Sequence, residues 1–318
     1  MTASQSAVVS ATTRTGWQAR TSRVIQFPLV RMVLAVIIVS AALNGTSAAL
    51  KAAGLSPVAG SPHRIPLLLL YTVATIAIVH LAYLLYVRLV ERRQLTEFTV
   101  HGAATELGFG ALTGMLLFAI TIGVLWTGGW YHVTGTNAWT AMAQPLLLAA
   151  GAAYVEELIV RGILFRNIED MLGSWIALAI TATIFGLLHM ANPHATIVAA
   201  VAIALEAGVL LGAAYLATRR LWLAIGIHFG WNFVQGGIFG VAVSGVTSNG
   251  LLRGELHGPP LLSGGSFGAE GSVIAVVACL AVAIPLIRIA QRRGHLSPPM
   301  WQRRPAVSDI PEAAGSST

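Results

Sequence analysis

The chain has 318 residues, of which 56% are hydrophobic and 10% are charged, and its net charge is +7. A soluble domain carries about 25% charged residues, so this composition, with a mean hydropathy of +0.75, excludes an ordinary soluble protein and predicts a polytopic membrane protein. The basic residues flank apolar segments. The positive charge therefore indicates membrane topology, and we expect contact with the lipid bilayer and no nucleic-acid partner.

Eight apolar windows approach the roughly 20 residues that are needed to cross about 30 Å of hydrocarbon. They predict membrane helices at 29–50, 65–87, 107–128, 141–165, 174–191, 196–217, 221–243 and 271–288, of which the fifth is short. No clean cleavage site follows the first window, which favours a permanent span over a signal peptide. The expected fold class is all-α, a transmembrane bundle of about eight helices.

Arginine and lysine are distributed unequally between the two membrane faces. With eight alternating spans, fifteen basic residues fall on one face and three, Lys51, Arg64 and Arg253, on the other, while Arg161 lies inside the fourth span. Because basic residues favour the cytoplasmic side, we expect both termini in the cytoplasm and the protein in the cell membrane.

Composition divides the chain into four parts. The ends, 1–25 and 291–318, are expected to be disordered and cytoplasmic, since small and polar residues dominate them. Between them we expect an N-terminal transmembrane hairpin at 26–100 and a core at 101–290. The single cysteine, Cys279, excludes an intramolecular disulfide and is expected to be a small core residue.

Three charged side chains interrupt the fourth span. Glu156, Glu157 and Arg161 each oppose insertion by roughly 2.5–3.5 kcal/mol at a helix centre, so we expect them to face a protein-lined cavity. Glu157 and Arg161 are four residues apart and can pair on one helix face. Glu156 points about 100° away, which leaves its carboxylate free to act as a general base. A buried ion pair that only locks helix packing would not explain Glu156.

Two further polar sites follow. His189 closes the fifth span, and Pro193 disfavours helix just beyond it, so we expect a helix break that lines a cavity. His228 and Asn232 share one face of the seventh span, where they can donate two hydrogen bonds to one oxygen. The alternative at each site is a hydrogen bond between helices. Together with Glu156, these groups describe hydrolysis of an amide by an activated water.

The same residues leave zinc binding as an alternative. Glu156, His189 and His228 are candidate ligands for Zn²⁺, which would lower the pKa of a bound water to about 7. However, the sequence has no His-Glu-x-x-His pair on one helix, and these ligands would come from three helices. We favour a site without metal or other cofactor.

Three motifs, in this order, resemble those of the CPBP (Abi) family of intramembrane proteases, which includes type II CAAX prenyl endopeptidases and bacteriocin-processing or immunity proteins. They are Glu-Glu-x-x-x-Arg at 156–161, Phe-x-x-x-His at 185–189 and His-x-x-x-Asn at 228–232. The resemblance covers roughly 85–290. It implies an intramembrane endopeptidase for membrane-associated protein or peptide substrates, CAAX-type lipidated tails being the best known. It also implies a chamber open to the cytoplasm and sideways to lipid.

The resemblance also implies residue roles. The water would be activated by Glu156 and His189, the oxyanion stabilised by His228 and Asn232, and the site shaped by Glu157 and Arg161. The alternative on the same fold is a non-catalytic membrane scaffold or a bacteriocin-immunity-type protein. A transporter is disfavoured because the first three spans contain almost no charged residues and no internal repeat is present.

Depth in the membrane conflicts with this assembly. Counted from the arginine-bearing ends of their spans, Glu156 is about nine residues deep, His228 about seven and His189 about fifteen. For the three to meet, the fifth helix must start deeper, tilt or be flanked by a re-entrant turn.

Other polar residues receive structural assignments. We expect Glu206 to pair with a polar group on a neighbouring helix and His80 to be structural. Glu270 is expected to lie at the membrane interface near a helix N-terminus.

Overall fold

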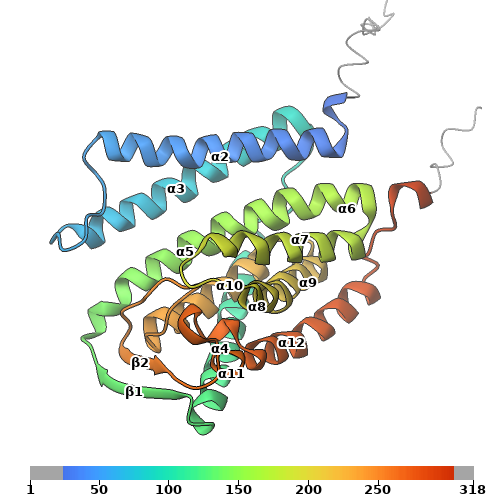
Figure 1. Ribbon diagram of the computed structural model, residues 1–318. Helices are drawn as coiled ribbons and strands as arrows, with labels where there is room; N and C mark the ends of the chain where they lie inside the picture. The colour runs from blue at the N-terminus through green and yellow to red at the C-terminus, as the bar shows by residue number, and fades with distance from the viewer. Residues whose placement is uncertain (1–23, 304–318) are drawn as a thin grey trace, which may run out of the picture.

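The computed structural model describes residues 24–303, so the disorder predicted for most of 1–25 and for 304–318 lies outside the described residues. The helices are α2 (Pro28–Ala52), α3 (Arg64–Tyr86), α4 (Ala103–Thr127), α5 (Ala143–Glu157), α6 (Arg166–Leu172), α7 (Ser174–Leu188), α8 (Ile197–Ile203), α9 (Val209–Thr218), α10 (Trp222–Phe233), α11 (Pro260–Ser263) and α12 (Val273–Arg292). Strands β1 (Tyr131–Thr136) and β2 (Leu252–Leu256) form one antiparallel pair. The fold is the expected all-α bundle with a small strand pair at one end (Figure 1).

π-helical segments join several helices into longer rods. α5 continues through Leu158–Phe165 into α6, and α8 continues through Ala204–Gly208 into α9. In the described part of the chain, six rods are long and apolar enough to cross a membrane: Pro28–Ala52, Arg64–Glu91, Ala103–Thr127, Ser174–Ala191, Ile197–Thr218 and Val273–Arg292. The protein is therefore a multi-pass membrane protein. The other two predicted spans, 141–165 and 221–243, are also largely helical but are not among these six.

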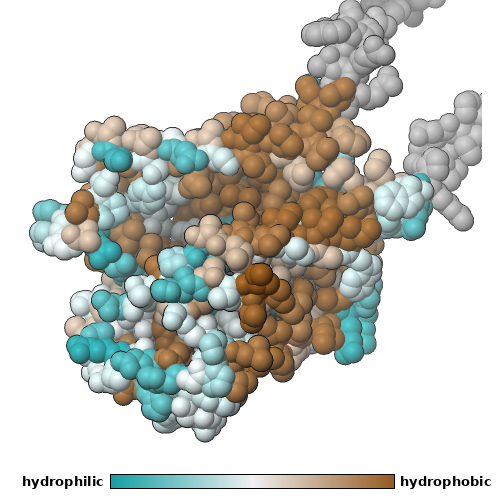
Figure 2. Space-filling view, in the orientation of Figure 1, coloured by the Kyte–Doolittle hydropathy of each residue, from teal (hydrophilic) through white to brown (hydrophobic). Residues whose placement is uncertain are grey.

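Apolar side chains cover the outside of these rods. Leu70 on α3, Phe109 on α4, Leu187 on α7 and Val277 on α12 are all exposed. On the face in Figure 2, hydrophobic residues cover much of the helical surface, whereas hydrophilic residues gather toward the side that carries β1 and β2. Exposed apolar surface of this extent is what a lipid-facing bundle requires.

Two helices touch backbone to backbone through four glycines. Gly110 and Gly114 of α4 face Gly226 and Gly230 of α10. A Cβ atom at Gly114 would lie only 2.0 Å from the carbonyl oxygen of Ile227, so no side chain fits there. This is the small-x-x-x-small packing that membrane helices use for close approach.

The same contact orients the polar face of α10. His228 lies two residues after Gly226, which places it about 200° around the helix from the glycine. Asn232 shares the face of His228 because it is one helical turn further on. Packing the glycines against α4 therefore turns His228 and Asn232 toward α5 and α7 on the opposite side.

One end of the bundle, which we call the arginine-rich end, contains the start of α2 and the ends of α3, α6, α9 and α12. Arg31 of α2 binds Asp170 of α6 with an N–O distance of 2.7 Å. Arg219, directly after α9, binds Glu169 of α6 at 2.6 Å. Arg293, directly after α12, donates to a carbonyl oxygen near the end of α9. The two strands and the start of α5 lie at the opposite end, which we call the hairpin end (Figure 1).

A buried ionic network closes the arginine-rich end. Arg93 donates two hydrogen bonds to the carboxylate of Glu97, at 2.6 and 2.8 Å. Arg166 pairs with Glu91, and Tyr83 donates to Glu97. The carboxylates of Glu91 and Glu97 are almost completely buried. Each buried charge therefore has an opposite partner, without which burial would be costly.

The C-terminal segment 291–303 is ordered, in place of the disorder predicted for it. The backbone N–H of Ser297 donates to the hydroxyl of Ser174 at 2.8 Å, and the N–H of Ser174 donates to the carbonyl oxygen of Ser297 at 3.0 Å. Arg303 donates to the carbonyl oxygen of Glu169. At the other end, Val24 and Ile25 lie in a helical turn. Backbone pairing, which composition does not report, fixes the C-terminal segment.

Candidate active site

The predicted pair of Glu157 and Arg161 is confirmed and includes a third residue. Arg161 donates to Glu157 Oε1 at 2.7 Å, and both side chains are completely buried. His228 donates from Nδ1 to the same Oε1 at 3.0 Å. Because a carboxylate can only accept, this bond places the proton of Nδ1 toward Glu157. Glu157 thus fixes the orientation of the His228 ring.

Arg161 makes further contacts to two other helical segments. It donates to the carbonyl oxygens of Ala207 and Gly208, at 3.2 and 3.1 Å, where the π-helical segment of the α8–α9 rod ends. Its guanidinium group also lies 4.8 Å from the centre of the Phe185 ring. These contacts join α5, α7 and the α8–α9 rod around one buried cation. The ion pair therefore does lock helix packing, and it orients His228 at the same time.

Glu156 is placed differently from its neighbour. Its side chain is 38% exposed, and its Oε2 atom lies 3.9 Å from Nε2 of His228. Within residues 24–303, Glu156 Oε2 has no hydrogen-bond partner. As the spacing predicted, one carboxylate is committed to structure and the other is free.

His189 follows the break at the end of α7. The α-helix ends at Leu188, and His189 begins a single 3₁₀ turn before the extended residue Asn192. Nδ1 of His189 donates to the carbonyl oxygen of Phe185 at 2.7 Å. A carbonyl can only accept, so the proton is on Nδ1, and the lone pair of the neutral ring is on Nε2.

One cavity of about 320 Å³ brings the four predicted catalytic residues together. Its lining includes Glu156, His189, His228 and Asn232. Sequence reasoning missed the other polar groups in its wall, which are Gln144, Asn192, Ser244, Thr247 and Ser248. Of these, only Asn192 had a signal, because it lies in the break after His189.

A second cavity, of about 220 Å³, shares Glu156 and His189 with the first. Its other walls include Ile159 and Leu188, and Leu188 is 59% exposed on the outer surface of α7. The polar site therefore adjoins an apolar lateral space between the α5–α6 rod and α7.

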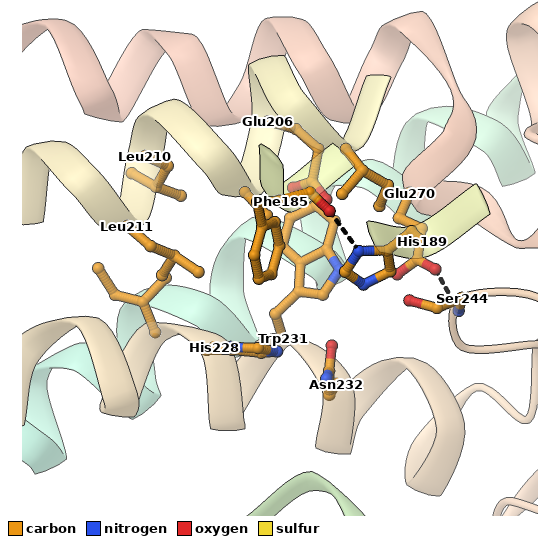
Figure 3. Close-up of a pocket in the computed structure, with 13 residues that line it drawn as sticks. Phe185, His189, Glu206, Leu210, Leu211, His228, Trp231, Asn232, Ser244 and Glu270 are labelled. Carbon is orange, nitrogen blue, oxygen red and sulfur yellow. Dashed lines mark hydrogen bonds between the residues drawn. The ribbon is translucent and has the colours of Figure 1, made fainter. Parts of the chain in front are cut away.

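A small cavity of about 30 Å³ lies beside the site, and its residues are shown in Figure 3. This volume has room for one or two waters. His189, Glu206, Trp231 and Glu270 are among its lining residues. The predicted interfacial position of Glu270 is wrong, because this side chain is 1% exposed and accepts the backbone N–H of Ser244. Packing of the long loop after α10 covers it.

The structural assignments of three other residues agree with the geometry. Cys279 is buried and donates from its thiol to Glu206, which gives Glu206 the expected partner on a neighbouring helix. His80 contacts the hydroxyl of Tyr154, with 2.5 Å between Nδ1 and the oxygen.

The donor set does not fit a metal centre as it is placed. No group of three or more His, Cys, Asp or Glu side chains in residues 24–303 is arranged to hold an ion. Among the candidate ligands Glu156, His189 and His228, both imidazoles use Nδ1 for hydrogen bonds to protein oxygens, which leaves Nε2 as the nitrogen that a metal would bind.

Comparison with known proteins finds one family resemblance, and it covers the site. Residues 138–234 match the family model described as type II CAAX prenyl endopeptidase Rce1-like. We call this part of the chain the Rce1-like segment, after the family that it resembles. The Rce1-like segment contains all three motifs but ends before Ser244 and Glu270, so it is shorter than the range over which the sequence resembles the family. No curated protein and no solved structure matches the chain.

Proposed function

We propose that the protein is an intramembrane endopeptidase that hydrolyses peptide bonds of membrane-associated substrates, with C-terminally lipidated CAAX-type proteins as one candidate class. The observation that carries the proposal is the unpartnered carboxylate of Glu156 in one cavity with His189, His228 and Asn232. The Rce1-like segment supports the same reaction class. The protein would act in the cell membrane with both termini in the cytoplasm.

The first step is attack of a water on the substrate carbonyl carbon. A water in the cavity would donate one hydrogen bond to Glu156 and one to the free Nε2 of His189, and its proton would move to this pair as the C–O bond forms. The proton then passes to the amine nitrogen as the C–N bond breaks. A general base of this kind contributes typically about 10²–10⁴-fold to the rate.

The tetrahedral intermediate carries a negative oxygen that needs donors. Asn232 supplies an amide N–H, and His228 supplies Nε2–H when it is doubly protonated. Two carboxylates and one guanidinium leave a net negative charge in the site, and an imidazolium at His228 balances it. Loss of one such donor typically costs about 10²–10³-fold in kcat.

The test is cleavage of membrane-anchored reporter peptides, including a farnesylated CAAX peptide, by the purified protein in detergent. Glu156→Gln and His189→Ala should each lower turnover by at least about 10²-fold. The matched controls are Glu255→Gln and His257→Ala, the same changes at an exposed pair on and beside β2. Full activity of both site variants would disprove the mechanism. Cellular function that survives Glu156→Gln would favour the scaffold or immunity-type alternative.

The proposal includes glutamate-type rather than metal-dependent hydrolysis. Elemental analysis of the active protein, paired with turnover after dialysis against a chelator, tests this. We expect activity without stoichiometric zinc. Loss of turnover on chelation, restored by added zinc, would overturn this part of the mechanism and leave the peptidase function in place.

A further inference from the structure

The catalytic cavity extends toward only one end of the bundle. From Glu156 it follows the first half of α5 past Leu148 to Gln144, which lies one residue after the start of the helix. On the other side it is bounded by the loop that follows α10, where Val246 and Thr247 are exposed. All of these residues lie between the catalytic groups and the hairpin end.

In the opposite direction the bundle is filled. Directly behind the site, Glu157 and Arg161 are completely buried. Next along the same rod come Ile163 and Phe165, which pack without exposure in the hydrophobic core. The ionic network around Glu91 and Arg166 then closes the arginine-rich end. No residue of this end, as far as the structure describes it, lines the cavity.

The charges of the two ends differ in a way that indicates their sides. Eleven arginines of the described chain lie at or near the arginine-rich end: Arg31, Arg88, Arg92, Arg93, Arg166, Arg219, Arg220, Arg288, Arg292, Arg293 and Arg303. Lys51, Arg64 and Arg253 lie toward the hairpin end. An excess of basic residues in short loops marks the cytoplasmic face, so the mouth of the cavity faces the other compartment.

We infer that the substrate reaches Glu156 and His189 from the non-cytoplasmic side of the membrane. The substrate class is then a membrane-anchored protein whose cleaved segment lies on that side, with its apolar anchor against the lateral space beside Leu188. Of the candidate substrates of the proposed function, this choice excludes CAAX-type proteins, because their lipidated tails lie on the cytoplasmic side. Apart from Glu156, the polar groups between the site and the mouth are neutral amides and hydroxyls, which suit an extended peptide backbone. This inference rests on the proposed function, and it reverses the cytoplasmic opening that the family resemblance implies.

Labelling of single added cysteines in intact cells tests the sidedness. Thr247→Cys places a thiol at the cavity mouth, and Gln291→Cys places one on the exposed surface of α12 at the arginine-rich end. The native Cys279 is completely buried and serves as background in the unchanged protein. A membrane-impermeant maleimide added outside should label Thr247→Cys in intact cells and should label Gln291→Cys only after permeabilisation.

Two further measurements separate this inference from the proposed function. After labelling and purification, modified Thr247→Cys should lose at least tenfold in turnover of the reporter peptide in detergent, whereas modified Gln291→Cys should keep it. If Gln291→Cys is labelled from outside and Thr247→Cys is not, the inferred orientation is wrong. If Thr247→Cys stays unlabelled even in detergent, the cavity does not open at the hairpin end, and the inference is wrong. If labelling follows the expected sides but no reporter is cleaved, the peptidase proposal fails while the orientation stands.

Discussion

The backbone contact between α4 and α10 gives the sharpest quantitative prediction. Gly114→Ala adds one methyl group, which would lie 2.0 Å from the carbonyl oxygen of Ile227 and 2.8 Å from the backbone nitrogen of Trp231. Both are backbone atoms and cannot rotate away, so the helices must separate by about 1 Å or more to reach van der Waals distance. Overpacking of this kind costs typically about 1–3 kcal/mol in the free energy of unfolding.

The same helix offers a matched control. Gly123→Ala is the identical change, but nothing lies within 4 Å of the added methyl group. Because alanine favours helix over glycine by roughly 0.8–1 kcal/mol, this variant should be as stable as the native chain or more stable. The two substitutions on α4 are therefore expected to change stability in opposite directions.

The assay is unfolding of the purified protein by SDS titration in mixed micelles, followed by loss of helical signal and combined with reporter turnover. Displacement of α10 also moves His228 and Asn232, and a misplacement of about 1 Å can cost roughly 10²-fold in rate. Gly114→Ala should therefore lose both stability and turnover. Equal unfolding free energies and equal turnover for Gly114→Ala and Gly123→Ala would refute the close crossing and the role we give it.

Two other predictions follow from buried charges. Glu157→Gln keeps the shape of the side chain but leaves Arg161 without a counter-charge, so we expect the free energy of unfolding to fall by about 3–5 kcal/mol. The value of kcat should fall by a larger factor than KM changes, because His228 loses its fixed orientation. An unchanged kcat would contradict this role of Glu157. At the arginine-rich end, burial alone would raise the pKa of Glu97, but the hydrogen bonds and charge of Arg93, with the charge of Arg166, lower it to about 2. Since this pKa is below the ordinary 4.5, the stabilisation is complete above pH 4.5 and is lost as the pH falls toward 2, by about 3 kcal/mol. Unfolding measured across that pH range should show this fall in the native chain and a smaller one in Glu97→Gln.

The pairing of Glu157 with Arg161 and the helix break at His189 could be predicted from the spacing of nearby residues. The four-residue separation of Glu157 and Arg161 required a shared face, and Pro193 required a helix break after His189. Neither inference depends on distant parts of the chain. The burial of Glu270 does depend on them, because it comes from the loop after α10 folding back so that the N–H of Ser244 reaches its carboxylate.

The glycine contact is intermediate between these cases. Gly-x-x-x-Gly occurs at 110–114 and again at 226–230, and each pattern alone marks a helix face suited to close packing. More than a hundred residues separate the two, and the bundle offers several other helices as partners. The sequence could therefore indicate which faces approach closely but not that they approach each other.

The conflict in depth arose from Arg166, which looked like the end of the fourth span. In the structure its charge is neutralised inside the protein by Glu91, so the rod continues for a further six residues to Leu172. The turn is made at Gly173, whose positive φ of 80° suits glycine, and α7 runs back beside the rod. Glu156 is seventeen residues before this turn and His189 sixteen after it, so at equal rise per residue the two lie at nearly the same depth. No tilt or re-entrant turn before α7 is needed. Arg166 therefore indicates the side of the membrane but not the end of its span, because its buried partner Glu91 lies 75 residues away in the sequence.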